Sequence, residues 1–365
     1  MEINLGKLRH NMGEIRSQLS PQTKLLAVVK ADAYGHGMVK IAEQALLSGA
    51  DMLCVAMPEE GQKLRQSGID APVIVLGGVT QEGMEASVEH GLIQTVYDRE
   101  SISWAQKAAE RLGCTAFVDI KIDTGMNRIG IKGAAEAREL LEALAISKNV
   151  KVHGAYTHYA VSEEDDDFTC AQFQCFLKAV EPIKAAYPEI MLHSSNSAGV
   201  FLHEYLHLDG VRCGIVMYGS APAFGMEAGL EPILSWKTRV MHVKEVEAGE
   251  SVGYGRTYFT RGRTKIATLP VGYGDGYIRA LGNKAHVLLG GRPAKVIGRV
   301  CMDQIMVDVT DIDVKNGDEA VLIGRQGENE ITPWDMALWA DTIPYEITLA
   351  ITQRVPKIYI AEGES

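Results

Sequence analysis

One lysine of this chain stands where a run of apolar residues gives way to a turn. Residues 25–29 are Leu-Leu-Ala-Val-Val, Lys30 follows them, and Tyr-Gly-His-Gly occupies 34–37. An apolar run bounded by turn residues predicts a buried strand, with Lys30 at its C-terminal end. An amine in a partly dehydrated pocket loses its proton more readily and can form a Schiff base. A solvated strand-end lysine is the alternative that this position alone leaves open.

Polar residues follow four further predicted strands in the same way. Any one of them has an ordinary explanation, such as a satisfied core histidine or a solvated arginine. Their recurrence at strand ends favours a shared site. These residues are Lys121 and Arg128 after the fifth strand, Thr157 and His158 after the sixth, Asn196 and Ser197 after the seventh, and Arg212 at the eighth, which closes with Cys213, Gly214 and Ile215.

The elements that must position these side chains alternate between apolar runs and helical patterns. Eight such strands with intervening helices predict a (β/α)8 TIM barrel, whose active site lies at the C-terminal ends of the strands. The predicted strands are 25–29, 52–56, 73–77, 94–97, 115–122, 151–157, 190–193 and 208–216, and the predicted helices include 38–48, 58–67, 101–112, 133–146 and 168–186.

From about residue 232 the pattern changes to short runs rich in Val, Ile, Thr and Gly. This pattern predicts a mainly-β C-terminal domain with one helix near 333–340. The expected division is 1–231 for the barrel and 232–365 for the β domain, and the first few residues could pair with the latter. The predicted β runs are 238–246, 264–269, 285–289, 294–299, 304–309 and 319–323.

Composition narrows the possible functions. The chain has 365 residues, 46% of them hydrophobic and 23% charged, and a formal net charge of −11. This charge argues against nucleic acid or an anionic membrane as a partner. We see no apolar run long enough to span a membrane and no secretory leader at residues 1–5. The six cysteines form no Cys-x-x-Cys pair and no zinc spacing, which predicts reduced thiols in the cytoplasm and no metal. The acidic run 163–167 is interpreted as a solvated loop rather than a metal site.

The strand-end residues and their neighbours resemble the alanine racemase family, whose members depend on pyridoxal phosphate. Gly298-Arg299-Val300-Cys301-Met302-Asp303 is an especially specific segment. The family's fold is a (β/α)8 barrel followed by a β domain, which agrees with the pattern above. Its members are head-to-tail homodimers in which the partner's β domain completes each site. The matching stretches are 27–37, 121–130, 157–160, 193–198, 211–219, 252–258, 269–279, 297–306, 343–346 and 354–356.

The resemblance implies a role for each matching residue. Lys30 would hold the cofactor as a Schiff base and act as one catalytic base, and Tyr254 of the partner chain would be the second. Both would need a lowered pKa to act near neutrality. Arg212 would bond the pyridine nitrogen and keep it unprotonated, which limits side reactions, and a His158–Arg212 relay could assist Tyr254. The other cofactor contacts implied are Tyr34, Asn196, Ser197, Tyr345 and the backbone N–H groups of Gly214 and Ile215.

Three further residues are implied at the substrate. Arg128 would meet the substrate carboxylate, helped by the backbone N–H of the partner's Met302. Lys121 matches a position that is often carboxylated by CO2 in this family, and the resulting anion would brace Arg128. A plain amine at Lys121 is the alternative.

The resemblance predicts interconversion of L- and D-alanine for peptidoglycan synthesis. The match begins at Glu2, earlier than in usual family chains, so this chain is either naturally short or cut from a longer protein such as a membrane-anchored serine racemase. Tyr345 favours alanine. A serine or broad-specificity racemase is the main rival. A related decarboxylase is disfavoured by Arg212, and a cofactor-binding barrel without activity is disfavoured by the β domain and Tyr254.

Overall fold

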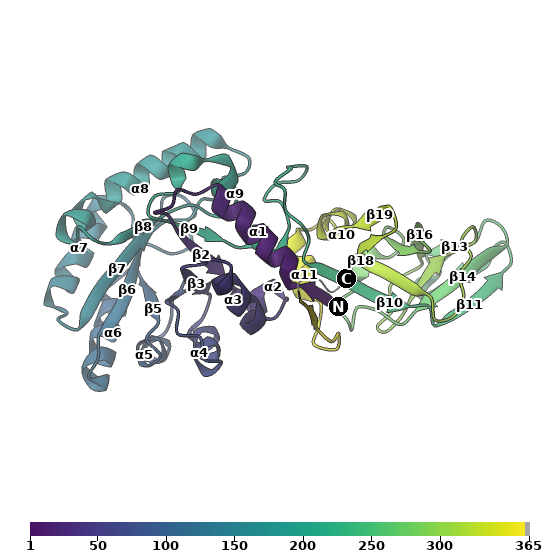
Figure 1. Ribbon diagram of the computed structural model, residues 1–365, viewed down its shortest axis with the longest axis horizontal. Coiled ribbons are helices and arrows are strands. Elements are labelled where there is room, and N and C mark those ends of the chain that lie inside the picture. The colour runs from purple at the N-terminus through teal and green to yellow at the C-terminus, as the bar shows by residue number, and fades with distance from the viewer. Residues whose placement is uncertain (362–365) are drawn as a thin grey trace.

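A closed barrel of eight parallel strands forms the N-terminal part of the computed structural model, which describes residues 1–361 (Figure 1). Each strand pairs with the next in sequence, and the last pairs back to the first. The fold predicted from the alternating pattern is therefore confirmed. The barrel strands are β2 (Lys24–Val28), β3 (Met52–Val55), β4 (Val73–Val75), β5 (Ile93–Val96), β6 (Ala116–Lys121), β7 (Val150–Tyr156), β8 (Met191–His193) and β9 (Gly210–Cys213).

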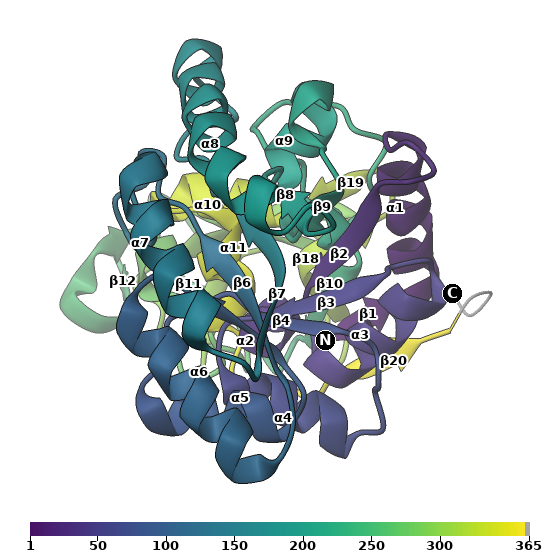
Figure 2. The same cartoon turned by 90° about the vertical axis from the view of Figure 1, so that its left-hand side faces the viewer.

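Helices lie around the outside of the barrel (Figure 2). Several begin where the sequence offers a cap: Thr80 accepts from the N–H of Gly83, and Asp98 accepts from that of Ser101. Pro58 occupies the first turn of its helix, where a missing N–H costs nothing. The helices are α1 (Leu5–Ser17), α3 (Met38–Leu47), α4 (Pro58–Gln66), α5 (Gln81–Glu89), α6 (Arg99–Leu112), α7 (Gly133–Ile146), α8 (Asp166–Ala186) and α9 (Ser197–Leu202), with short 3₁₀ turns η1 (Glu204–Leu206) and η2 (Ile215–Tyr218).

The eighth strand is shorter than the predicted run 208–216. At Gly214 the backbone turns to φ −116° and ψ −97°, and the chain continues as the 3₁₀ turn η2. An apolar run alone cannot distinguish a buried strand from a buried turn, because both hide the same side chains. The consequence is that Gly214 and Ile215 leave the barrel wall and lie at its mouth.

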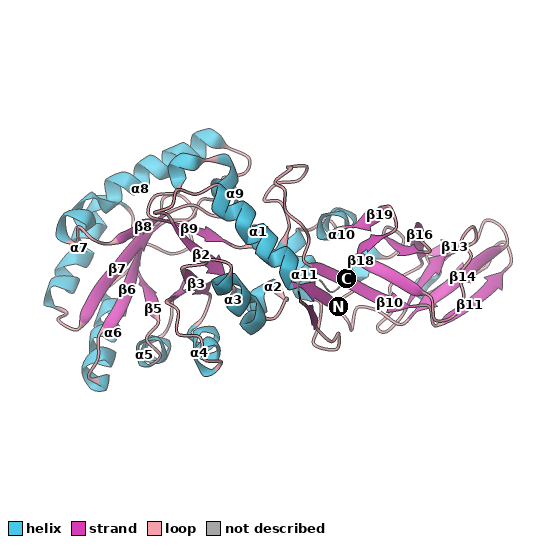
Figure 3. Cartoon of the chain, viewed as in Figure 1, coloured by secondary structure: helices cyan, strands magenta, loops and turns pink. Residues whose placement is uncertain are grey.

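The C-terminal part of the chain is mainly β structure, and Figure 3 shows it as a separate body of strands. One large sheet has the order β11-β14-β17-β16-β15-β18-β10-β1-β20, with β19 paired to β18. A small hairpin, β12 with β13, lies apart. The strands are β10 (Leu234–Arg239), β11 (His242–Val246), β12 (Ser251–Val252), β13 (Tyr258–Phe259), β14 (Thr264–Leu269), β15 (His286–Leu289), β16 (Arg292–Ile297), β17 (Ile305–Asp308), β18 (Glu319–Gln326) and β19 (Asn329–Ile331).

Two predicted elements of this part have different outcomes. The run 238–246 is not one strand: Val240 and Met241 separate β10, which pairs with β18, from β11, which pairs with β14. The change of partner breaks the run although its residues favour strand throughout. The predicted helix 333–340 is confirmed as α10 (Pro333–Ala340), where Thr332 and Asp335 form a capping box. The remaining elements are α11 (Pro344–Ala350) and the turns η3 (Tyr254–Arg256) and η4 (Arg279–Leu281).

The two ends of the chain join the barrel to the β domain. Strand β1 (Glu2–Asn4) pairs with β10 and with β20 (Ile358–Ile360), so both ends of the described chain lie at the junction (Figure 1). Ile3, Leu26, Trp236 and Ile347 belong to one hydrophobic cluster that runs from the barrel into the β domain. This shared core holds α11 against the mouth of the barrel. No helix within residues 1–361 has the length and apolar character needed to cross a bilayer.

Candidate active site

A cavity of about 570 Å³ opens at the C-terminal ends of the barrel strands. The sequence pattern predicted a site at this end, and most of the barrel residues singled out there line the cavity, whereas Thr157 and Cys213, both wholly buried, do not. One lining residue comes from beyond the barrel, since α11 contributes Tyr345. The predicted residues brought together are Lys30, Tyr34, Lys121, Arg128, His158, Asn196, Ser197, Arg212, Gly214, Ile215 and Tyr345.

Lys30 begins a tight left-handed turn after β2. Residues 31–34 (Ala-Asp-Ala-Tyr) all have φ between 51° and 55°, the segment labelled α2 (Lys30–Tyr34). This conformation is unfavourable for residues other than glycine, so surrounding contacts must hold it. The Ala31 N–H donates to Glu60 (2.6 Å), and Asp32 accepts from the Met38 N–H (3.0 Å) and from Lys357 Nζ (2.8 Å). The turn fixes Lys30 at the cavity wall.

The two lysines of the cavity are poised to lose protons. Burial, followed by the nearby positive charge of Arg128, lowers the pKa of Lys30. Burial and the charges of Arg212 and Arg128 lower the pKa of Lys121 to about 7. The expectation that Lys30 lies in a partly dehydrated pocket is met. Burial and arginine charge lower the pKa of Lys30 without any contribution from the cofactor.

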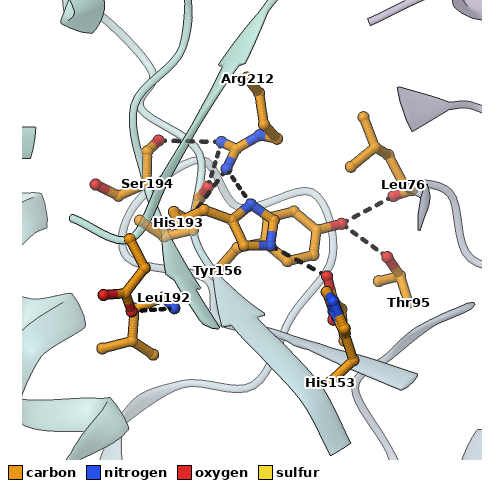
Figure 4. Close-up of polar contacts among 11 residues, drawn as sticks. Leu76, Thr95, His153, Tyr156, Leu192, His193, Ser194 and Arg212 are labelled. Atoms are coloured by element: carbon orange, nitrogen blue, oxygen red, sulfur yellow. Dashed lines mark hydrogen bonds and ion pairs between the residues drawn. The ribbon is translucent and has the colours of Figure 1, made fainter. Parts of the chain in front are cut away.

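Arg212 is almost wholly buried and held by four short hydrogen bonds (Figure 4). Nη1 donates to Nδ1 of His193 (2.8 Å) and to its carbonyl (3.0 Å). Nη2 donates to the carbonyls of Thr157 (2.7 Å) and Ser194 (3.0 Å). No acceptor within residues 1–361 lies in hydrogen-bond geometry to Nε. The guanidinium is thus clamped, with one N–H left for a bound group.

His158 lies beside this clamp, as the predicted relay requires. Its Nδ1 is 3.5 Å from Nη2 of Arg212. Burial, and then the positive charge of Arg212, lowers the pKa of His158 well below its usual value, so the ring is neutral at physiological pH.

A second part of the cavity is shaped to accept a small anionic group. Gly214 donates its N–H to Ser197 Oγ (3.0 Å). A Cβ on Gly214 would lie 2.5 Å from the Tyr34 hydroxyl, so only glycine fits there. The Tyr34 ring contacts that of Tyr345, 5.6 Å between centroids. Two phenols, one hydroxyl and the backbone at Gly214 therefore meet where a phosphate could be held.

Arg128 is carried over the cavity by a closed loop after β6. The Ile131 N–H donates to the Lys121 carbonyl (3.0 Å), and the Asp123 N–H donates to the Ile131 carbonyl (2.9 Å). The Asp123 carboxylate accepts from the N–H groups of Gly125 and Asn127, which shapes the loop tip.

Two predicted site residues do not line the cavity of their own chain. Tyr254 and Met302 lie on the β domain, with exposed fractions of 71% and 53%. Their assignment came only from the resemblance to the family, which implies that Tyr254 and Met302 act in the site of a partner chain.

One charged lining residue and one hydrogen-bond network were not predicted from the sequence. Glu163 is exposed, as a solvated loop predicts, but it also lines the cavity mouth. Burial and then the negative charge of Glu163 raise the pKa of Tyr345 to about 12. The position of Glu163, five residues after His158, was the available signal. Asp119 lies inside β6 and gave no signal. His193, which bonds Arg212, ends β8 and begins the matching stretch 193–198, but it was not assigned to the site.

Comparison with known proteins agrees with this geometry. Residues 3–222 match the family model described as "Alanine racemase, N-terminal domain", and residues 233–359 match "Alanine racemase, C-terminal domain". The chain belongs to the alanine racemase family.

Relatives in this family match along their full length. The alanine racemase of Symbiobacterium thermophilum is 46% identical, covering 99% of this chain and 97% of the relative. That of Halothermothrix orenii is 43% identical, covering 98% and 96%. Among solved structures, the alanine racemase of Clostridium difficile 630 has a TM-score of 0.93 at 37% identity, covering 100% of this chain and 96% of the other. The alanine racemase of Bacillus anthracis, solved with bound L-Ala-P, has a TM-score of 0.92 at 34% identity, covering 99% and 95%.

Proposed function

We propose that this member of the alanine racemase family binds pyridoxal phosphate and interconverts L- and D-alanine. The observation that carries the proposal is one cavity that holds Lys30, with its lowered pKa, together with the clamped Arg212 and the Ser197–Gly214 cradle. Few other chemistries need a reactive amine, a fixed cation and a phosphate-sized cradle in one place.

The residues present fit the cofactor. Its phosphate would be held by the cradle at Gly214, Ser197 and Tyr34, where a Cβ would intrude. Arg212 would offer its remaining N–H to the pyridine nitrogen, and an arginine there leaves that nitrogen unprotonated. Lys30 would hold the cofactor's aldehyde carbon. When bound, the cofactor supplies an electron-withdrawing ring that stabilises negative charge on the substrate's α-carbon.

Racemisation requires a proton to leave one face of the α-carbon and another to reach the opposite face. Lys30 is suited to one face, because its lowered pKa makes the neutral amine more accessible near neutrality. Tyr254 is proposed as the base on the other face, supplied by the β domain of a partner subunit. Its exposed position on its own chain supports this arrangement. We therefore propose a homodimer with shared sites, in which the partner's Met302 also faces the substrate.

Arg128 is proposed to bind the substrate carboxylate, because a guanidinium can pair with both carboxylate oxygens. Lys121 lies nearby, since the Arg128 charge contributes to lowering its pKa. A neutral amine is the form that adds CO2, so a pKa of about 7 makes carboxylation of Lys121 feasible at physiological pH. The resulting carbamate would be negatively charged and would attract Arg128, whereas a protonated Lys121 would repel it.

We propose alanine rather than serine as the preferred substrate. Tyr345 lines the cavity from α11 and is packed against Tyr34, which leaves a wall suited to a methyl group. The L-Ala-P bound in the Bacillus anthracis structure supports alanine for a relative of the same fold. D-alanine for peptidoglycan and a cytoplasmic location remain predictions from the sequence.

The test is an activity assay on the purified, cofactor-loaded protein. We expect L-alanine to yield D-alanine, scored by chiral chromatography, with L-serine, L-lysine and L-ornithine run in parallel. Lys30→Ala should abolish turnover. Lys24→Ala is the matched control, because Lys24 lies at the other end of the same strand and is exposed. Absence of D-alanine, or faster turnover of serine, would overturn the proposal.

A further inference from the structure

A carboxylate is buried inside the barrel beneath Arg212. Asp119 lies on β6 with no exposed surface and bridges two histidines. Its Oδ2 is 3.1 Å from Nε2 of His193, and its Oδ1 is 2.7 Å from Nδ1 of His153. His193 in turn accepts from Arg212, as Figure 4 shows. A continuous chain of hydrogen bonds therefore links Arg212 to a buried anion.

The donors in this series of hydrogen bonds determine which nitrogen of His193 carries the proton. Arginine can only donate, so Nδ1 of His193 must accept and carry no proton. Nε2 must then carry the proton, which it donates to Asp119. Burial lowers the pKa of His193 to about 4, in agreement with a neutral ring. The ring is also fixed in place by Tyr156, which stacks on it with 4.8 Å between centroids.

Asp119 also supplies a negative charge near Arg212. Burial works to raise the pKa of Asp119, but its hydrogen bonds to His153 and His193 outweigh this and lower the pKa to about 2. The carboxylate is therefore ionised at neutral pH. The four acceptors that clamp Arg212 are neutral, and a buried cation without a counter-charge is costly. Asp119 opposes the lowering of the Arg212 pKa that burial causes.

The other partner of Asp119 faces away from the cavity. His153 lines a separate hollow at the N-terminal end of the barrel, together with Asp51. Burial works to lower its pKa, but the bond to Asp119 raises it. His153 therefore shares the carboxylate without touching Arg212.

We propose that Asp119 is a positioning residue for the reaction, which acts through His193 to fix the hydrogen bonding and charge of Arg212. The proposal rests on the proposed function, because Arg212 would meet the cofactor ring. It predicts that the Asp119 charge affects the chemical step although Asp119 lies outside the cavity.

The first experiment is a double-mutant cycle on the cofactor-loaded enzyme. Asp119→Asn keeps the size of the side chain and removes its charge. We expect kcat for alanine to fall about tenfold to a hundredfold, the scale of one charged hydrogen bond, while KM changes less than about threefold. His193→Asn should have a similar effect. The double variant should be no worse than the poorer single variant, because both substitutions interrupt one path.

Two control variants separate this role from simple stabilisation. His153→Gln removes the other partner of Asp119, and Asp51→Asn removes a carboxylate that pairs with Arg16 and Lys24 near the same end of the barrel. Both should leave kcat within about threefold of wild type, whatever their effect on thermal stability. Additive losses in the cycle, or an equal loss in His153→Gln, would overturn the proposal.

The second experiment needs no activity and covers the case in which Asp119→Asn does not fold. Histidine-selective ¹⁵N NMR of the wild-type protein, with and without cofactor, reports which ring nitrogen carries the proton, and His193→Asn assigns the signal. We expect His193 to be protonated at Nε2 alone at neutral pH. A proton on Nδ1 would overturn the network. If the wild type fails to racemise alanine but shows this tautomer, the proposed function fails and the network does not.

Discussion

Sharing of each active site between two subunits can be tested by mixing two inactive variants. Lys30 lines the barrel cavity, whereas Tyr254 lies on η3 of the β domain, outside the cavity and 71% exposed. Lys30→Ala should destroy the barrel half of every site in its own dimer. Tyr254→Phe should destroy the β-domain half. A mixed dimer should hold one site in which both halves are wild type.

The fraction of racemase activity that should be recovered follows from this arrangement of two half-sites. Equal amounts of the two chains with free exchange give about half mixed dimers, since pairing is statistical. Each mixed dimer has one intact site of two, so the mixture should recover about a quarter of wild-type activity per chain. A site built within one chain would give no recovery at all, because each chain then lacks one of the two bases.

The assay is D-alanine formation after subunit exchange, with different affinity tags used to isolate the mixed dimers. The control mixes wild type with the double variant Lys30→Ala/Tyr254→Phe, whose mixed dimers contain no intact site. If the sites are shared, only the wild-type homodimers are active, and the mixture keeps about a quarter of full activity. If each site is built within one chain, every wild-type chain stays active, and the mixture keeps about half. Inactive mixed dimers in the first experiment, or about half activity in the control, would refute the reasoning.

Three further predictions follow from single residues of the cavity. We expect the wild type to prefer alanine over serine about tenfold to a hundredfold in kcat/KM, and Tyr345→Asn should narrow this ratio because the amide offers a hydrogen-bond partner to the serine hydroxyl. An unchanged ratio would show that Tyr345 does not set the preference. Arg212→Glu should slow racemisation and increase pyruvate formed from alanine by transamination, since a carboxyl group can share a proton with the cofactor's ring nitrogen; normal racemisation without extra pyruvate would contradict this role. The pKa of Lys121 is lowered to about 7, so the neutral amine is the main form above that pH. A carbamate signal from ¹³C-bicarbonate should therefore grow as pH rises through 7 and be lost in Lys121→Met, and a signal that persists in that variant would place the carbamate elsewhere.

The barrel was predictable because its local signals agree with its tertiary structure. Runs such as residues 25–28 of β2 and the whole of β3 are buried, so their side chains are apolar, and caps such as Asp98 mark where helices begin. One prediction was wrong because neighbouring strands decide where a strand ends. The break between β10 and β11 arises from a change of partner strand, which no local pattern records.

The site was predictable where reactive groups follow strands, because parallel strands bring their C-terminal ends to one mouth. Lys30, Arg128 and Arg212 were found in this way, and all line the cavity. Glu163 was interpreted only as part of a solvated loop, since an exposed acidic run gives no sign that one member faces a cavity. Asp119 was not singled out, because it lies within β6 and not at a strand end.

The sequence by itself determined which chemical groups are available and on which strand ends they lie, because periodicity and turn residues encode those positions locally. Only the tertiary structure decided how these groups act on one another. The pKa of Lys121 is lowered by burial and by Arg212 from a distant strand, together with Arg128 of the adjoining loop, and the tautomer of His193 needs Asp119 on one side and Arg212 on the other. Such effects depend on burial and on distances of a few ångströms between residues far apart in sequence, which no local pattern contains.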